Sequence, residues 1–169
     1  DTKNSPAVTI ETRYQFKIVD RPSSELFLAV ESPDKYEITL NGHQLGLKNL
    51  TDWWIDPSLR RISVDHEFLR IGVNDIIMKS RYDNDHPGME TIYLAGDFGV
   101  SKVKGAWSVV KAPQNLEIGD WTVQGLPFYG GNATYKTVAL HENQPGERYF
   151  LKIKRFAGVA VKIRINCVK

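Results

Sequence analysis

Two adjacent tryptophans flanked by aspartates are the side chains of this sequence whose types and spacing best suit ligand chemistry. Trp53 and Trp54 stand between Asp52 and Asp56. A tryptophan ring can stack on the C–H face of a sugar while polar groups hold the hydroxyls, as ligand sites combine an apolar wall with a few placed polar groups. Neighbouring residues in a strand face opposite ways, so only one ring can enter a core. Core packing is the alternative for either ring alone, because large aromatic side chains fill cores.

A second aromatic group follows later in the chain. Trp121 precedes Phe128 and Tyr129, and the pair Gly130-Gly131 comes next. These rings could line a groove or form a seam between two modules. We favour the seam, because aromatic residues are enriched where protein surfaces meet.

Two aspartates in a turn segment suggest a metal site. Asp83 and Asp85 occupy the first and third positions of a loop whose sixth residue is Gly88, as in an EF-hand. The twelfth position is Leu94 rather than glutamate, and no helices are expected on either side, so an EF-hand is excluded. A looser structural calcium site at Asp83 and Asp85 stays open, because oxygen-rich loops suit hard cations. No other cofactor is predicted.

The sequence contains no constellation that predicts catalysis. Glycosidases need two carboxylates across a cleft, and no pattern pairs any two of the available acids. The sequence has no nucleophile elbow, no His-Glu-x-x-His motif and no phosphate-binding loop. The four histidines show no metal-ligand spacing, and the single cysteine, Cys167, excludes a disulfide framework. We therefore expect a chain with no catalytic activity of its own.

Charge and hydropathy argue against two further classes of protein. The net charge is +2 from 22 basic and 20 acidic residues, whereas a nucleic-acid-binding protein carries a concentrated basic face. The basic residues near the C-terminus alternate with apolar ones, which is typical of a strand with one solvated side. No apolar run reaches the roughly 18 residues of a membrane span, and residues 1–6 carry no signal-peptide pattern. We expect neither a nucleic-acid partner nor a membrane span.

Strands are the elements expected to position these side chains. Residues 13–18, 36–40 and 161–165 alternate between apolar and polar types, which is typical of antiparallel strands with one buried face. Residues 26–30 are apolar throughout, as in a strand in the middle of a sandwich. Turn signals such as Asn41-Gly42 recur at the spacing of a sandwich. The residues expected in the core are Tyr14, Phe16, Leu28, Val30, Ile38, Leu40, Ile62, Val64, Ile76, Met78, Ile92 and Leu94.

The pattern of residues 13–42 returns in residues 134–166. Both stretches show three strand-like segments that end on an asparagine at the mouth of a turn. We therefore expect the same three strands in both. The predicted organisation is a β-sandwich module over residues 1–112, followed by residues 113–169. The second part either opens a similar module or supplies strands that complete the first sandwich.

The order of these motifs resembles the sugar-binding domain of glycoside hydrolase family two. Residues 14–16 are similar to its "Y-x-x-F" entry strand, residues 36–46 to its "V-x-V-N-G-x-x-x-G" hairpin, and residues 64–77 to its "D-I-T-x-x-L-x-x-G-x-N-x-I-x-V" segment. Residues 88–100 and 121–135 resemble C-terminal regions of large secreted bacterial enzymes related to alpha-L-rhamnosidases. The second copy departs from the pattern, because Cys167 rather than glycine follows Asn166.

The resemblance implies a fold and a setting. The fold is an all-β, antiparallel, galactose-binding-like jelly-roll sandwich with very little helix. The setting is extracellular or periplasmic, in a larger multi-domain chain whose catalytic acids lie in a separate barrel domain. Two functions stay open. The chain is either a non-catalytic module that binds a polysaccharide or oligosaccharide for a glycoside hydrolase, or a structural spacer that packs on the catalytic domain and touches no glycan.

Overall fold

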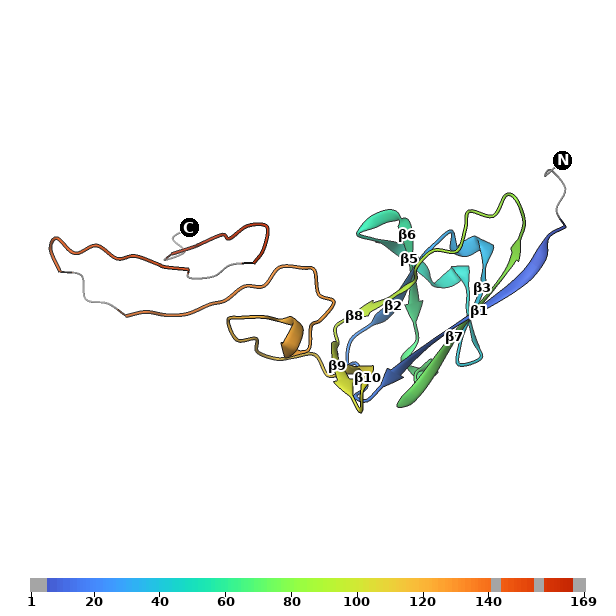
Figure 1. The fold of residues 1–169 in the computed structure, drawn as a ribbon, viewed down its shortest axis with the longest axis horizontal. Helices are drawn as coiled ribbons and strands as arrows, with labels where there is room; N and C mark the ends of the chain where they lie inside the picture. Colours follow the sequence, from blue (N-terminus) through green and yellow to red (C-terminus); the bar gives the residue numbers. More distant parts are fainter. Residues whose placement is uncertain (1–5, 141–143, 154–156, 166–169) are drawn as a thin grey trace. The chain divides into compact units, whose positions relative to one another are not determined.

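The computed structural model describes residues 6–140, 144–153 and 157–165 of the protein. The chain divides into two units, residues 1–133 and residues 134–169. Every strand found in the described residues belongs to the first unit, which is therefore the unit that positions the candidate site (Figure 1).

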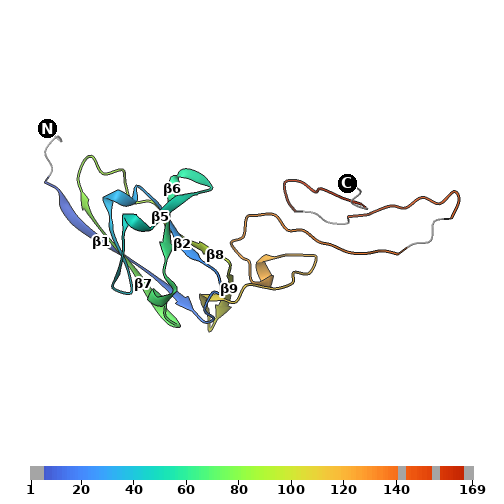
Figure 2. The ribbon, with the colours of Figure 1, turned by 180° about the vertical axis from the view of Figure 1, so that it is seen from behind.

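The first unit consists of two β-sheets, which can be followed from opposite sides in Figures 1 and 2. One sheet has six strands in the order β4-β3-β7-β1-β10-β9, and the other has four in the order β5-β6-β2-β8. The strands are β1 (Val8–Ile18), β2 (Leu26–Glu31), β3 (Glu37–Leu40), β4 (His43–Leu45), β5 (Leu50–Trp54), β6 (Asp56–Val64), β7 (Gly72–Tyr82), β8 (Tyr93–Gly96), β9 (Gly99–Val103) and β10 (Ala106–Val110).

Helix is confined to short 3-10 turns in the described part of the chain. These are η2 (Pro33–Lys35), η3 (Leu47–Asn49), η4 (His66–Phe68) and η5 (Thr122–Gln124). The prediction of an all-β chain with very little helix is therefore confirmed. Within the same residues, no helix has the length and apolar character needed to span a bilayer.

The core lies between the two sheets and follows the alternation of the sequence. In β3 the buried residues are Ile38 and Leu40, whereas Glu37 is exposed. The expected core residues of β2, β3, β6 and β7 are all buried, and Tyr14, Phe16, Ile92 and Leu94 are half-buried against them. Residues of β2 are buried on both faces of the sheet, as the unbroken apolar run predicts.

A two-residue turn joins β3 to β4, at the place where the sequence predicts a tight hairpin. Leu40 pairs with His43, and Asn41 and Gly42 between them have φ of 52° and 86°. A tight hairpin turn of this kind needs positive φ at both central positions, which asparagine and glycine tolerate best. The backbone N–H of Asn41 also donates to the carbonyl of Asp75, so the turn is held against β7.

One strand pairing differs from the expected antiparallel arrangement. β10 pairs with β1 in parallel, with Lys17 opposite Ser108 and Ile18 opposite Val109. The other ladders of the two sheets are antiparallel. The prediction of a wholly antiparallel fold is wrong for this one pair of strands. Alternation in the sequence fixes which face of a strand is buried, but it does not fix which strand lies beside it or in which direction.

The second unit does not show the expected repeat. Residues 134–140, 144–153 and 157–165 contain no strand, so the prediction of three strands over residues 134–166 is wrong for the residues that the structure describes; the rest of that range lies outside them. Apolar side chains of this unit such as Leu140 and Phe150 are exposed. An alternating apolar and polar sequence forms a strand only where a neighbouring strand supplies hydrogen bonds and a core covers the apolar face. Three strands without such a core are only marginally stable.

The predicted division of the chain after residue 112 stays a prediction. Residues 113–133 belong to the first unit, and the carbonyl of Gly125 accepts a hydrogen bond of 2.7 Å from the N–H of Val100 in β9. This segment therefore lies along the outer edge of the six-stranded sheet.

Candidate functional site

The candidate site lies on the hairpin formed by β5 and β6. The edge strand β5 pairs antiparallel with β6, with Trp53 opposite Arg60 and Trp54 opposite Asp56, and the register shifts on both sides of Trp53. Such bulges twist an edge strand and re-aim its side chains. Ile55 closes the hairpin with φ of 63°, a region that β-branched residues rarely adopt, and its side chain is 76% exposed. The hairpin thus presents an apolar tip between two aspartates.

The two tryptophan rings have different environments, as expected for neighbours in a strand. Trp54 is half-buried, with its ring 6.0 Å from that of Phe27 in an edge-to-face contact and 5.5 Å from that of Tyr93. Trp53 is 50% exposed. Trp54 therefore anchors the hairpin on the sheet, and Trp53 leaves much of its indole accessible to a ligand.

The two aspartates of the hairpin are held by backbone amides. Asp52 Oδ1 accepts a hydrogen bond of 2.8 Å from the N–H of Trp53, and Asp56 Oδ1 accepts one of 2.8 Å from the N–H of Ser58. The hydrogen bonds from Ser58 lower the pKa of Asp56, because they favour the charged form. An ionised carboxylate has about four acceptor positions, so both groups retain acceptors for the hydroxyls of a ligand.

An aromatic face lies on the outer side of the four-stranded sheet, opposite the core. We use this name for Phe27, Trp54, Arg61 and Tyr93. The guanidinium carbon of Arg61 lies 4.0 Å from the centre of the Phe27 ring, a cation–π geometry. Ala29 pairs with both Arg61 and Tyr93 in the sheet register and is fully buried, so the larger side chains around it close over it.

The sequence did not identify three members of the aromatic face. Phe27, Arg61 and Tyr93 come from three different strands, and no spacing in the sequence links them. The sequence did contain one indication of this face. The unbroken apolar run of residues 26–30 predicts a strand that is buried on both faces. The run shows that something covers Phe27 and Ala29, but not which residues do so.

The second aromatic group lies in the first unit. The rings of Trp121 and Tyr129 are 6.1 Å apart, and Phe128 contacts Trp107 with ring centres 5.4 Å apart. Trp107 was not predicted as a member of this group. The ammonium of Lys102 lies over the Trp107 ring, 5.1 Å from the ring centre. The hypothesis that Trp121, Phe128 and Tyr129 form a seam between modules stays a prediction.

The geometry around Asp83 and Asp85 is that of a turn. Asp83 Oδ1 accepts a hydrogen bond of 3.1 Å from the N–H of Asp85, and its other oxygen lies 3.9 Å from Nε of Arg81. Within the described ranges, no three His, Cys, Asp or Glu side chains come together as metal ligands. The two carboxylates alone supply fewer oxygen ligands than the six to eight that calcium takes.

A serine and a histidine meet beside this turn, with the histidine in a tautomer that does not suit activation of a serine. His86 Nε2 lies 3.1 Å from Oγ of Ser80, and the N–H of Gly88 donates to Nδ1 over 3.1 Å. Because Nδ1 accepts, the neutral ring carries its proton on Nε2 and donates to the serine. A nucleophilic serine needs the opposite arrangement, with Nε2 as the acceptor. We interpret the pair as a structural support for the turn.

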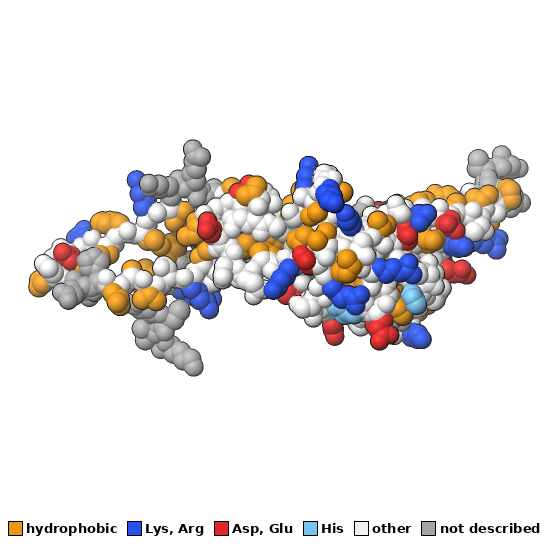
Figure 3. Space-filling model, turned by 90° about the horizontal axis from the view of Figure 1, so that it is seen from below, with side chains coloured by type: hydrophobic (Ala, Val, Ile, Leu, Met, Phe, Trp, Pro, Cys, Tyr) orange, Lys and Arg blue, Asp and Glu red, His pale blue; other side chains and the backbone are white. Residues whose placement is uncertain are grey.

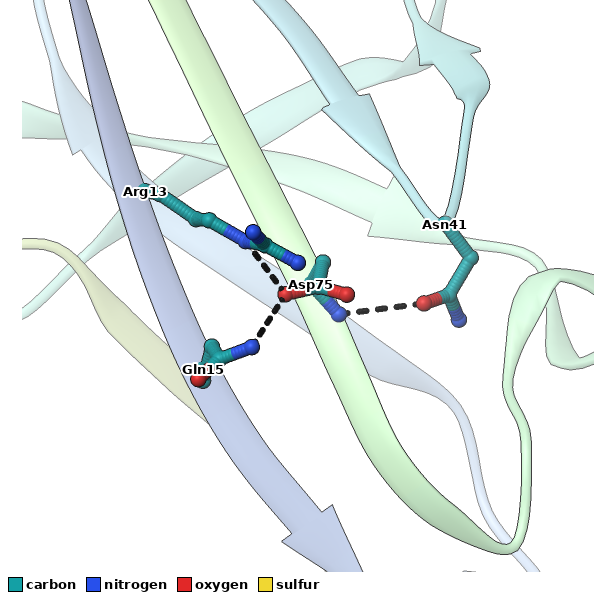
Figure 4. A network of polar contacts seen from close by, with 4 residues as sticks. All are labelled: Arg13, Gln15, Asn41 and Asp75. Carbon is teal, nitrogen blue, oxygen red and sulfur yellow. Dashed lines mark hydrogen bonds and ion pairs between the residues drawn. The ribbon is translucent and has the colours of Figure 1, made fainter.

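The outer face of the six-stranded sheet is polar. A shallow pocket of about 120 Å³ on this face is lined by Glu37, Thr39, Ile77 and Lys79 and contains none of the predicted site residues. Closer to the centre of the sheet, Oδ1 of Asp75 accepts hydrogen bonds of 2.8 Å from both Arg13 and Gln15 (Figure 4). On the face that Figure 3 shows, basic, acidic and apolar side chains are intermixed, in keeping with the balanced charge of the sequence.

Comparisons with known proteins do not assign the chain to a family. No protein-family model matches it, and comparisons with curated proteins and with solved structures found no match either.

Proposed function

We propose that this protein is a non-catalytic carbohydrate-binding module with a galactose-binding-like jelly-roll fold. Its parent is an extracellular or periplasmic glycoside hydrolase that degrades polysaccharides. The sequence motifs that resemble the sugar-binding domain of glycoside hydrolase family two support the fold and the setting. The two-sheet, β-sandwich-like architecture of the first unit is compatible with that resemblance.

The observation that carries the proposal is the exposed indole of Trp53 on a hairpin that also carries two carboxylates held by backbone amides. Trp54, through its contacts with Phe27 and Tyr93, anchors the hairpin that carries this ring. A rigid aromatic surface can stack on the C–H face of a sugar without losing much conformational entropy, and nearby acceptors fix the hydroxyls. Asp52 and Asp56 supply those acceptors.

One observation favours the alternative function of a structural spacer. Three large apolar side chains of the segment after β10 are exposed: Ile118, Val123 and Phe128. Exposed apolar residues that gather into a patch mark sites of contact with another protein surface. In this alternative the segment packs on a neighbouring domain and the hairpin binds no glycan.

Calorimetric titration of the protein with a panel of soluble oligosaccharides tests the proposal. We expect Trp53→Ala to abolish binding of any glycan that the wild type binds, and to leave the unfolding temperature nearly unchanged, because the ring is half exposed. Trp107→Ala is the matched control, since Trp107 is 49% exposed and lies outside the hairpin. The proposal fails if no glycan binds, or if Trp53→Ala and Trp107→Ala have the same effect on binding.

A further inference from the structure

Arg61 has an unusual environment for a half-buried arginine. Its Nε is buried and has no hydrogen-bond partner. No hydrogen bond or ion pair joins its guanidinium to another residue of the described part of the chain, although the side chain is largely removed from water. Leaving a buried donor of a charged group unpaired is unfavourable. Four other arginines of the first unit have protein acceptors, namely Arg13, Arg21, Arg70 and Arg81. Arg60 has none among the described residues, but unlike Arg61 it is exposed to water.

Glu31, a carboxylate on the same face of the sheet, forms no ion pair with this cation. Glu31 lies two residues beyond Ala29 along β2, and Ala29 pairs with Arg61. The carboxylate of Glu31 instead accepts a hydrogen bond of 3.2 Å from Oγ of Ser58. Among the described residues, the positive charge of Arg61 is therefore offset by the π face of Phe27 alone, which is a weak partner compared with a carboxylate.

The surroundings of the cation specify the kind of anion that fits. Tyr93 is 43% exposed and packs against Trp54, and it pairs with Ala29 as Arg61 does, so an aromatic wall lies on the same face of the sheet as the guanidinium. The planar fork of an arginine matches a carboxylate with two parallel hydrogen bonds. A sugar unit that carries a carboxylate on its ring offers both features together: an apolar C–H face for the wall and an anion for the fork.

We propose that the aromatic face binds the carboxylate of a uronic acid unit through Arg61. This inference rests on the proposed function, and it names the class of glycan as acidic. Trp54 is part of both the β5–β6 hairpin and this face, so the charge is recognised on the sheet surface against which the hairpin packs. The expected ligand is an oligosaccharide that contains uronic acid units.

Titration with matched acidic and neutral probes tests the inference. The probes are an oligogalacturonate and an aldouronic-acid fragment of xylan, each used beside its own carboxyl-reduced form. We expect at least one acidic probe to bind about tenfold or more tightly than its reduced form, because hydrogen bonds to charged groups contribute about 1.5–3 kcal/mol. Arg61→Gln should remove this preference, and Arg60→Gln, at the neighbouring exposed arginine, should retain it.

The possible failures are distinguishable. If each reduced probe binds as tightly as its acidic form, the inference is overturned while carbohydrate binding stands. If neither probe nor any neutral glycan binds, both proposals are overturned. A loss of the preference in Arg60→Gln but not in Arg61→Gln also overturns the inference. The comparison of native and reduced probes on the wild type needs no variant, so it decides the question even if Arg61→Gln fails to fold.

Discussion

Asn74 offers the sharpest test of how the sandwich is held together. Its side chain is fully buried, and all its hydrogen-bonding positions are used. Oδ1 accepts from Nδ2 of Asn41 and from the N–H of Arg70, each over 2.8 Å. Nδ2 donates to the carbonyls of Arg70 and Gly72 over 2.8 and 3.1 Å. The one amide therefore ties the β3–β4 turn to the loop that precedes β7.

Asn74→Asp keeps the shape of this side chain but removes both donors. At neutral pH the ionised carboxylate would face two carbonyls that have lost their partners. Each unsatisfied buried group costs about 1–3 kcal/mol, so we expect the free energy of unfolding to fall by about 4 kcal/mol. When the carboxyl is protonated, one O–H can donate to one of the carbonyls, and the expected loss is about 2 kcal/mol.

This difference predicts how the stability of the variant depends on pH. Burial and the two carbonyls disfavour the charged form, so the pKa of the carboxyl at position 74 should be higher in the folded state than the roughly 3.9 of an unfolded aspartate. The deficit relative to wild type should therefore be smallest below about pH 4. It should grow as the pH rises through the raised folded-state pKa.

Urea unfolding followed by tryptophan fluorescence, at about pH 7 and about pH 4, measures both quantities. Asn115→Asp is the matched control, because it makes the same chemical change at an exposed position. The account of the network is refuted if Asn74→Asp is as stable as Asn115→Asp at neutral pH. A deficit that does not change between the two pH values would refute the assignment of Nδ2 as the donor to both carbonyls.

Two further predictions concern the backbone and the surface. Ile55→Gly should raise the free energy of unfolding by about 1 kcal/mol in urea titrations, because a left-handed conformation is unfavourable for isoleucine and readily adopted by glycine; an unchanged or lower stability would contradict the strained turn. The hydrogen bonds from Arg13 and Gln15 lower the pKa of Asp75, so Asp75 stabilises the fold above the ordinary aspartate pKa and loses this effect as the pH falls through its lowered value. Asp75→Asn should therefore lower the unfolding temperature at pH 7 and have progressively less effect on acidification, and an equal effect at every pH would contradict it.

The alternation of apolar and polar residues was sufficient to predict the strands and most of the core. It succeeded because one face of each strand packs against the other sheet, so burial follows a period of two. Asn41 and Gly42 were predictable for a local reason, since the turn needs positive φ at both positions. The parallel pairing of β10 with β1 was not predictable, because alternation does not specify which strand lies beside which, or in which direction.

The same pattern was misleading in residues 134–165. There the alternation is as regular as in β1, but the described residues lack the strand neighbours that turn a pattern into a sheet. The candidate site was predictable only in part. Two adjacent tryptophans imply opposite environments, which the structure confirms, whereas the neighbours of Trp54 come from β2 and β8 and could not be read from spacing.

The most direct test of carbohydrate binding at the hairpin is an NMR titration of the indole N–H signals. The sequence has four tryptophans, at positions 53, 54, 107 and 121, and single Trp→Phe variants assign each signal. On addition of a glycan selected by calorimetry, we expect the signal of Trp53 to shift most, with a smaller change at Trp54 and none at Trp107 or Trp121. Shifts confined to Trp107 and Trp121, or no shift at Trp53 at saturating glycan, would contradict the central claim.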